Sequence, residues 1–214
     1  MKCVIVTNGQ IEDYQWLKKQ VESADILLCA DGAAKHLMNI GVYPDRILGD
    51  FDSIDQESLE WIRKKKIREE HFPTKKDVTD TDIAIDHALS YQPEEIIILG
   101  AIGNRMDHTL GNLYLLEKYR NSVESLIIMN PQNMISLIEG TVNIQHQKNT
   151  TASIIPISEK LEGITLEGFE YPLKDAALIR GESKGISNRI VEENATVCIE
   201  KGIGFFILAW EQLP

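Results

Sequence analysis

Ile47-Leu48-Gly49-Asp50-Phe51-Asp52-Ser53 is the stretch that decides the fold of this chain. Its two leading apolar residues are typical of the end of a buried strand, and Gly49 lets the chain turn sharply. In an α/β sheet, the carboxyl end of such a strand faces the ligand crevice. Two carboxylates placed there suit Mg²⁺, which takes oxygen ligands and keeps waters that phosphate can replace. The stretch therefore predicts an α/β sheet with a metal site at its strand ends.

The same stretch has a plainer interpretation, in which the two carboxylates only turn the chain and cap the next helix. Ser53 would then be the N-cap, and Gln56 would complete a capping box. The distribution of aspartate favours the metal interpretation. Of 13 Asp residues, 12 lie between Asp13 and Asp107, whereas Glu is spread over both halves. Solubility alone would not separate two residues of equal charge, but turns, caps and metal sites favour the shorter carboxylate.

Composition bounds the class of protein. The chain has 214 residues, 43% of them hydrophobic, which is ample for a core. A net charge of −11 argues against nucleic acid as the main partner and is compatible with metal ions and cationic small molecules. We expect Cys3 and Cys29 to be buried, reduced thiols. The sequence has neither the apolar N-terminus of a signal peptide nor an apolar run of about 20 residues, so we expect a cytoplasmic protein without a membrane span.

Strand-like and helix-like patterns alternate through the first part of the chain. This alternation, with nearly continuous apolar strands, predicts an α/β domain with a mostly parallel, doubly wound sheet. The predicted strands are 2–7, 26–30, 47–48, 67–72, 96–99 and 126–129, and the predicted helices are 12–21, 33–39, 56–65, 79–89 and 107–119. We interpret the basic residues that end the helix at 56–65 as a solvated end.

After about residue 130 the pattern changes to short apolar runs separated by turn residues, with no helical spacing. This predicts a small all-β domain, either a sandwich or a barrel. We place the two domains at residues 1–132 and 133–214. The predicted strands of the second domain are 135–138, 142–145, 152–156, 164–166, 195–199 and 204–209.

Several acidic residues follow predicted strands or precede predicted helices. Asp31, Asp50 and Asp52 come after strand ends, so their loops should converge on one edge of the sheet. Asp77 and Asp80 lie near the N-terminus of the helix that Thr79 caps, where backbone N–H groups also favour anions. For Asp82 we prefer ordinary charge compensation in the first turn of that helix, and Asp86 only continues its polar face.

The loop at 100–112 is a glycine-containing turn from a strand to a helix, which can bring backbone N–H groups against phosphate. It matches neither the dinucleotide fingerprint nor the Walker sequence. Arg105 is placed to clamp a phosphate with two hydrogen bonds. Asp107 would reach the metal or orient a neighbour, and for His108 a structural and a catalytic role both stay open. With the carboxylates, this loop predicts a Mg²⁺–nucleotide site for phosphoryl transfer.

The order of these motifs resembles the thiamine pyrophosphokinase family, from about Asn8 to the end of the chain. The motifs that carry the resemblance are Ala30-Asp31-Gly32-Ala33, Gly49-Asp50-Phe51-Asp52-Ser53, Lys76-Asp77-Val78-Thr79-Asp80, Gly103-Asn104-Arg105-Met106-Asp107-His108 with Asn112, and Gly185-Ile186-Ser187-Asn188. The chain departs from the family at Asn104, where a second glycine is usual; asparagine also tolerates left-handed backbone.

The resemblance implies transfer of the diphosphoryl group of ATP to the hydroxyl of thiamine, giving thiamine diphosphate and AMP. It also implies a catalytic first domain, a β-sandwich second domain that binds thiamine, and a homodimer. The implied acidic cluster, which would hold Mg²⁺ and orient the hydroxyl, is Asp31, Asp50, Asp52, Asp77, Asp80 and Asp107, with Asp50, Asp52 and Asp80 as metal ligands. The residues implied to line ATP are Gly103, Arg105, His108 and Asn112. Those implied to touch thiamine are Ser187 and Asn188.

Two rival interpretations stay open. Asp50-Phe51-Asp52 also resembles the motif of aspartyl-phosphate phosphatases, in which Asp50 would be a covalent nucleophile. A thiamine- or nucleotide-sensing module would bind these ligands without turnover. From residues alone, Gly185–Asn188 is a turn between strands.

The last strand bears on assembly. Apolar residues recur on both of its faces, from Phe205 to Trp210. One face can pack inside the second domain, and the other needs cover, which a two-fold partner would supply. With the resemblance, this predicts a homodimer whose active site lies at the subunit interface. Trp210 we expect in the core or the interface.

Overall fold

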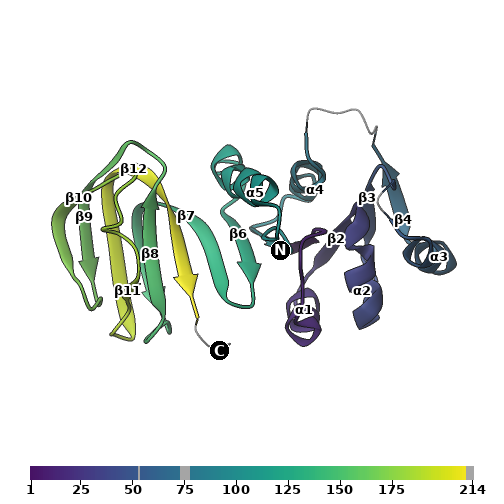
Figure 1. Cartoon of the computed structure of the whole chain (residues 1–214), viewed down its shortest axis with the longest axis horizontal. Coiled ribbons are helices and arrows are strands. Elements are labelled where there is room, and N and C mark those ends of the chain that lie inside the picture. Colours follow the sequence, from purple (N-terminus) through teal and green to yellow (C-terminus); the bar gives the residue numbers. More distant parts are fainter. Residues whose placement is uncertain (53, 73–77, 211–214) are drawn as a thin grey trace. The chain divides into compact units, whose positions relative to one another are not determined.

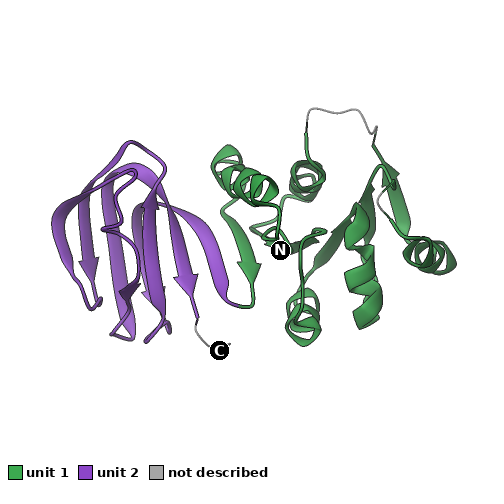
Figure 2. Cartoon of the chain, viewed as in Figure 1, with its two compact units in different colours: residues 1–131 green, residues 132–214 purple. Residues whose placement is uncertain are grey.

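The computed structural model describes residues 1–52, 54–72 and 78–210 of the chain. They form two compact units, Met1–Pro131 and Gln132–Pro214 (Figure 2). Ser53 and Asp77, to which the sequence assigns roles, lie outside the described residues. None of the helices described has the length and apolar character needed to cross a membrane.

The described residues of the first unit form a sheet in the order β6-β5-β1-β2-β3-β4, and each neighbouring pair of strands is parallel. Burial of both faces of the central strands explains their continuous apolar sequences. The strands are β1 (Lys2–Val6), β2 (Ile26–Ala30), β3 (Arg46–Gly49), β4 (Arg68–His71), β5 (Glu95–Leu99) and β6 (Ser125–Asn130). Because all six point the same way, their carboxyl ends lie along one edge.

Helices connect these strands, and Figure 1 shows α4 and α5 on one side of the sheet with α1 and α2 on the other. A buried cluster joins Leu17, Leu37 and Ile62 of the first three helices to the sheet. The helices are α1 (Tyr14–Val21), α2 (Ala34–Ile40), α3 (Gln56–Lys65), α4 (Asp80–Leu89) and α5 (Met106–Lys118), with a short 3₁₀ turn, η1 (Asp31–Ala33). The predicted order of strands and helices in this unit is confirmed.

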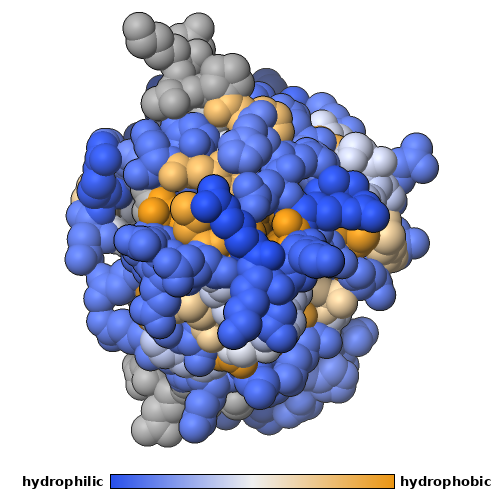
Figure 3. All heavy atoms as spheres, turned by 90° about the vertical axis from the view of Figure 1, so that its right-hand side faces the viewer, coloured by the Kyte–Doolittle hydropathy of each residue, from blue (hydrophilic) through white to orange (hydrophobic). Residues whose placement is uncertain are grey.

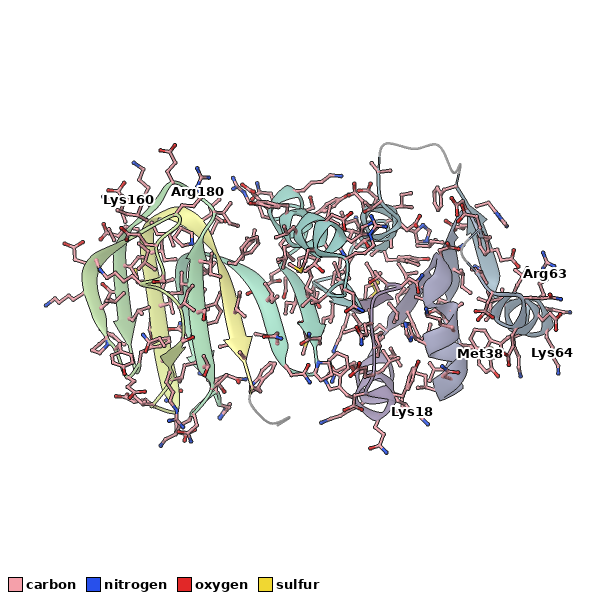
Figure 4. The ribbon with its side chains drawn as sticks, in the orientation of Figure 1. Lys18, Met38, Arg63, Lys64, Lys160 and Arg180 are labelled. Carbon is pink, nitrogen blue, oxygen red and sulfur yellow. The ribbon has the colours of Figure 1, made fainter. Side chains whose placement is uncertain are left out.

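Helix α3 shows how local sequence sets its ends. It begins and ends at the residues that the sequence predicts, Gln56 and Lys65. Asp55 is its N-cap, since its carboxylate accepts the Ser58 N–H at 2.9 Å. The prediction that Gln56 completes a capping box is therefore wrong, because Gln56 is the first residue of the helix. The basic end of α3 is exposed, as predicted. Figure 4 shows Lys64 extending outward. Figure 3 views the molecule from the right-hand side of Figure 1, and hydrophilic residues cover most of that face.

The cysteines are free thiols. Cys3 and Cys29 are fully buried in β1 and β2, as the apolar runs around them predict. Burial raises the pKa of the Cys3 thiol to about 12 and also raises the pKa of Cys29. Both thiols therefore stay protonated and behave as small core residues.

The second unit is all β in its described residues, as predicted. Two long strands, β7 and β12, pair antiparallel along most of their length. One part of β12 also pairs with β9 and the other with β8, so the long strands continue from one sheet into a second. The strands are β7 (Asn133–Gln145), β8 (Thr151–Pro156), β9 (Lys160–Glu167), β10 (Leu173–Ile179), β11 (Asn188–Arg189) and β12 (Asn194–Ala209). Side chains from both sheets form one buried cluster, which makes the unit a sandwich.

The long strands correct the sequence prediction. Each was predicted as two short strands, at 135–138 and 142–145 and at 195–199 and 204–209. Gly140 takes a φ of +67° within β7, and a register shift follows Ile199 in β12, so each strand bends without leaving its partner. Strand β10 was missed because its polar residues, Lys174 and Asp175, hide the apolar pattern.

Candidate active site

A cavity of about 680 Å³ lies in the first unit, at the edge where the parallel strands end. Five segments line it: the loop after β1, the start of η1, Asp50 after β3, the start of α4, and the loop between β5 and α5. Asp31, Asp50 and Asp80 therefore face one cavity, together with Arg105 and His108. The structure thus brings together residues that lie far apart in the sequence, because parallel strands end at one edge.

Three carboxylates meet beside this cavity. Asp31, Asp50 and Asp52 each offer one oxygen, and these oxygens lie within 4.8 Å of one another. Asp31 is only 3% exposed and takes a φ of +34°. Gly49 makes room for it, since a Cβ at position 49 would lie 2.7 Å from the Asp31 Cβ. We name Asp31, Asp50 and Asp52 the acidic trio; Asp80, a predicted metal ligand, lies on the same cavity but not in the trio.

The acidic trio is electrostatically strained. The pKa of Asp52 is raised, first by a hydrogen bond with the Asp50 side chain and then by some loss of solvation and by the negative charges around it. Asp31 and Asp80 are among those charges. A group of carboxylates that repel one another in this way binds a cation favourably, because the cation stabilises their ionised forms.

The start of α4 positions Asp80. Thr79 is the N-cap, as predicted, and its hydroxyl accepts the Asp82 N–H at 3.3 Å. The buried carboxylate of Asp82 accepts two hydrogen bonds from the Lys118 ammonium, at 2.6 and 2.8 Å, and one from the Tyr119 hydroxyl at 2.6 Å. Asp82 therefore ties α4 to the end of α5, a structural role that goes beyond charge compensation in the first turn.

The loop between β5 and α5 is held by its own helix. The Thr109 hydroxyl lies 3.2 Å from both the N–H and the carbonyl oxygen of Gly103. The Asn112 amide donates to the carbonyl of Ala101 at 2.8 Å. Asn112 thus shapes the loop as well as lining the cavity. The described residues with a positive φ do not include Asn104, so the loop does not use a left-handed backbone there.

Arg105 and Asp107 form an ion pair at the start of α5. The guanidinium donates to the two carboxylate oxygens of Asp107, at 3.2 and 2.6 Å. This pairing lowers the pKa of Asp107 to about 2, so the pair is charged throughout the neutral range. Both side chains are exposed. Of the described candidates in this unit, Asp52 and Asp107 do not line the cavity themselves.

Ser187 and Asn188 lie next to each other in the second unit. Ser187 takes a φ of +59°, and its N–H donates to the Ser153 hydroxyl at 3.0 Å. The Asn188 amide bonds to both backbone groups of Tyr171: its oxygen accepts the N–H at 3.1 Å, and its nitrogen donates to the carbonyl at 2.8 Å. Asn188 therefore fixes the backbone at Tyr171.

Sequence reasoning missed the loop after β1, Thr7–Gln10, which lines the cavity. The available signal was Asn8-Gly9 at the end of a predicted strand, the same feature that identified Asp31 and Asp50. Gly9 also lies against the next strand end, because a Cβ there would be 2.0 Å from the Gly100 carbonyl oxygen. His36 accompanies this loop, with Nε2 3.0 Å from the Gly9 carbonyl oxygen.

Comparison with known proteins gives matches in both units. The family model described as "Thiamin pyrophosphokinase, catalytic domain" matches residues 17–128, and the one described as "Thiamin pyrophosphokinase, vitamin B1 binding domain" matches residues 139–203. The chain is 36% identical over 169 residues to the thiamine pyrophosphokinase of Bacillus subtilis, covering 78% of this chain and 79% of that protein.

Solved structures agree. The crystal structure of the Bacillus subtilis thiamine pyrophosphokinase superposes with a TM-score of 0.89 at 29% identity, covering 99% of this chain and 100% of that one. The structure of the thiamin pyrophosphokinase of Geobacillus thermodenitrificans gives a TM-score of 0.86 at 29% identity, covering 99% and 98% of the two chains.

Proposed function

The chain belongs to the thiamine pyrophosphokinase family, and we propose that the cavity in its first unit is the active site. The protein transfers the diphosphoryl group of ATP to the hydroxyl of thiamine, which gives thiamine diphosphate and AMP. The observation that carries the site assignment is the convergence of Asp31, Asp50, Asp80 and the Arg105 loop on one cavity, with Asp52 beside the first two. The parallel strands and the helices on both sides support a doubly wound first domain at residues 1–132 and a thiamine-binding second domain at 133–214.

The donor set of the acidic trio fits Mg²⁺. All three side chains offer carboxylate oxygens, which a hard cation prefers, and a separation of no more than 4.8 Å suits a single ion after small side-chain rotations. We propose that Asp50 and Asp52 hold Mg²⁺ with Asp31 beside them, and that Asp80 contributes from α4. A bound Mg²⁺ neutralises charge on the transferred phosphates. We also propose that Asp77 belongs to this acidic cluster, as the resemblance implies.

The remaining residues position the reactants. The transferred group carries its charge on phosphate oxygens, so catalysis depends on alignment and charge stabilisation. Gly103, Arg105, His108 and Asn112 are the proposed ATP-binding residues, and all four line the same cavity. Asp107 holds Arg105 through their ion pair. One carboxylate of the acidic cluster orients the thiamine hydroxyl toward the β-phosphorus.

The test of this function is AMP release from ATP over a panel of acceptor alcohols. We expect AMP to form in equimolar amount with thiamine diphosphate, and only when thiamine and a divalent cation are present. The comparisons support neither rival interpretation. A sensing module would release no AMP, and an aspartyl-phosphate phosphatase would carry acid-stable phosphate label on Asp50.

Arg105→Lys tests the phosphate clamp. Lysine keeps the charge but loses the planar fork that meets two oxygens at once, so we expect weaker ATP binding and slower turnover, by roughly tenfold each. Steady-state kinetics with varied ATP measures both. Asp107→Asn is the companion variant, because it releases Arg105 without removing it. Unchanged kinetics of Arg105→Lys would show that Arg105 is an ordinary surface residue.

We propose that the protein is a cytoplasmic homodimer with thiamine bound at the subunit interface by Ser187 and Asn188. Support comes from the outer face of the second unit. Phe206 and Leu208 point into its buried cluster, so Phe205 lies on the opposite face. In register with Phe205 on the neighbouring strands are Leu137 and the exposed Ile155. An apolar row of this kind is typical of a surface that a second copy covers.

Mixing two inactive variants tests this assembly. Asp52→Asn removes the metal ligand and Asn188→Ala the thiamine contact. If one site draws on both subunits, each mixed dimer regains one intact site, and random pairing returns activity to roughly a quarter of wild type. Light scattering verifies the dimer, and unfolding curves verify that each variant folds, because Asn188 also holds the Tyr171 backbone. No recovery after proven chain exchange would place the whole site within one chain.

A further inference from the structure

The two carboxylates of Asp50 and Asp52 converge because of the residue between them. Phe51 takes a φ of +65°, a left-handed conformation that an aromatic residue rarely adopts. It closes a tight turn in which the Asp52 N–H donates to Asp50 Oδ1 at 3.2 Å. Such a backbone conformation costs free energy and persists only where its surroundings hold it. The residues that hold Phe51 therefore decide where the two carboxylates lie.

One aromatic neighbour holds the Phe51 ring from β4. The imidazole of His71 stacks on it with ring centroids 4.2 Å apart and an interplanar angle of 28°. His71 is the last residue of β4 and lies opposite Gly49 in the parallel ladder. The next residue, Phe72, donates its N–H to the Gly49 carbonyl at 2.9 Å. The end of β4 is thus fixed beside the turn, and Phe51 also packs against the buried core.

The position of His71 suggests a role other than folding. Its side chain is 63% exposed, and its other described side-chain contact is with the Glu69 carboxylate, 3.2 Å from Nε2. Contacts at such exposure contribute little to overall stability. Stacking on Phe51, by contrast, acts on the single residue that lies between Asp50 and Asp52 of the acidic trio.

We propose that His71 is a positioning residue for the metal site: its ring stacks on Phe51 and keeps the left-handed turn that brings Asp50 and Asp52 together. The inference rests on the proposed function of this cavity. It requires an aromatic face at position 71 and does not require a titrating group. Residues that orient metal ligands in this way typically contribute about tenfold to a hundredfold in metal affinity or activity.

Three variants separate this role from a merely structural one. His71→Ala removes the stack, and His71→Tyr restores an aromatic face without the imidazole. Tyr43→Ala is the matched control, because it removes a comparable stack in the same unit, between Tyr43 and Trp61, with centroids 5.0 Å apart and an interplanar angle of 24°. Tyr43 is 45% exposed and does not line the cavity.

The first readout is the binding of Mn²⁺ to the nucleotide-free protein. It is measured as the decrease of the free-ion signal in electron paramagnetic resonance. We expect His71→Ala to weaken Mn²⁺ binding by about tenfold and to raise the half-saturating Mg²⁺ concentration for turnover by a similar factor. His71→Tyr should return both values to within about threefold of wild type, and Tyr43→Ala should leave both unchanged. Urea unfolding should show similar, small losses of stability in His71→Ala and Tyr43→Ala.

Wild-type Mn²⁺ affinity in His71→Ala would overturn the inference. So would failure of a folded His71→Tyr to recover, equal weakening by Tyr43→Ala, or a wild-type protein that binds no Mn²⁺. AMP release by the wild-type protein is measured on the same preparation. Its absence would refute the proposed function, whereas normal AMP release with unchanged Mn²⁺ binding in His71→Ala would refute the positioning role alone.

Discussion

Asp52→Asn is expected to lower turnover by about a hundredfold to a thousandfold, because charge neutralisation by a metal contributes several kcal/mol to such reactions. Asparagine keeps the shape of the side chain but removes the charge that binds Mg²⁺. The fold should stay intact, since Asp52 is exposed. The matched control is Asp175→Asn, which removes the same charge from an exposed position in the second unit and should leave turnover near wild type.

The stability of Asp52→Asn also has an expected sign. The folded protein raises the pKa of Asp52, so the ionised form is the less favourable one in the folded state. Its destabilising effect is present above the raised pKa and disappears below the ordinary value of 3.8. Without metal, Asp52→Asn should therefore be as stable as wild type or slightly more stable at neutral pH, and equal to it in acid. Near-normal turnover of the folded variant would end the assignment of Asp52 as a ligand.

Gly9→Ala is expected to damage both stability and turnover. The new Cβ would lie 2.0 Å from the Gly100 carbonyl oxygen and 3.2 Å from that of Ile102, and backbone atoms cannot rotate away as a side chain can. One of the two cavity loops must move. Overpacking of this kind typically costs 1–3 kcal/mol, so we expect the free energy of unfolding to fall by about 2 kcal/mol and turnover to fall with it.

Gly111→Ala is the control for this substitution. Its Cβ would meet nothing within 4 Å, and it lies on the exposed side of α5. Alanine is the better helix former by about 1 kcal/mol, so this variant should be more stable than wild type in urea unfolding. If Gly9→Ala unfolded and turned over like wild type, the close approach of the two loops would not matter for the site.

The sequence by itself determined the order of elements in the first unit and the edge at which its acidic residues gather. Both follow from local signals. Continuous apolar runs predict buried parallel strands, and turn residues predict where each run ends. Because parallel strands all end at one edge, Asp31, Asp50 and Asp52 could be placed together before any distance was known, and the family resemblance added Asp80 to them.

Only the tertiary structure decided which of those residues touch. Asp31 joins Asp50 and Asp52 because Gly49 leaves room for its side chain, while Asp80 stays on the cavity wall. The stack of His71 on Phe51 and the bent strands β7 and β12 likewise had no local signal. For Asp107 the sequence left two roles open, and the structure shows its carboxylate paired with Arg105. Periodicity and turn residues fix backbone conformation, but contacts between loops depend on strand register and side-chain packing, which the whole fold sets.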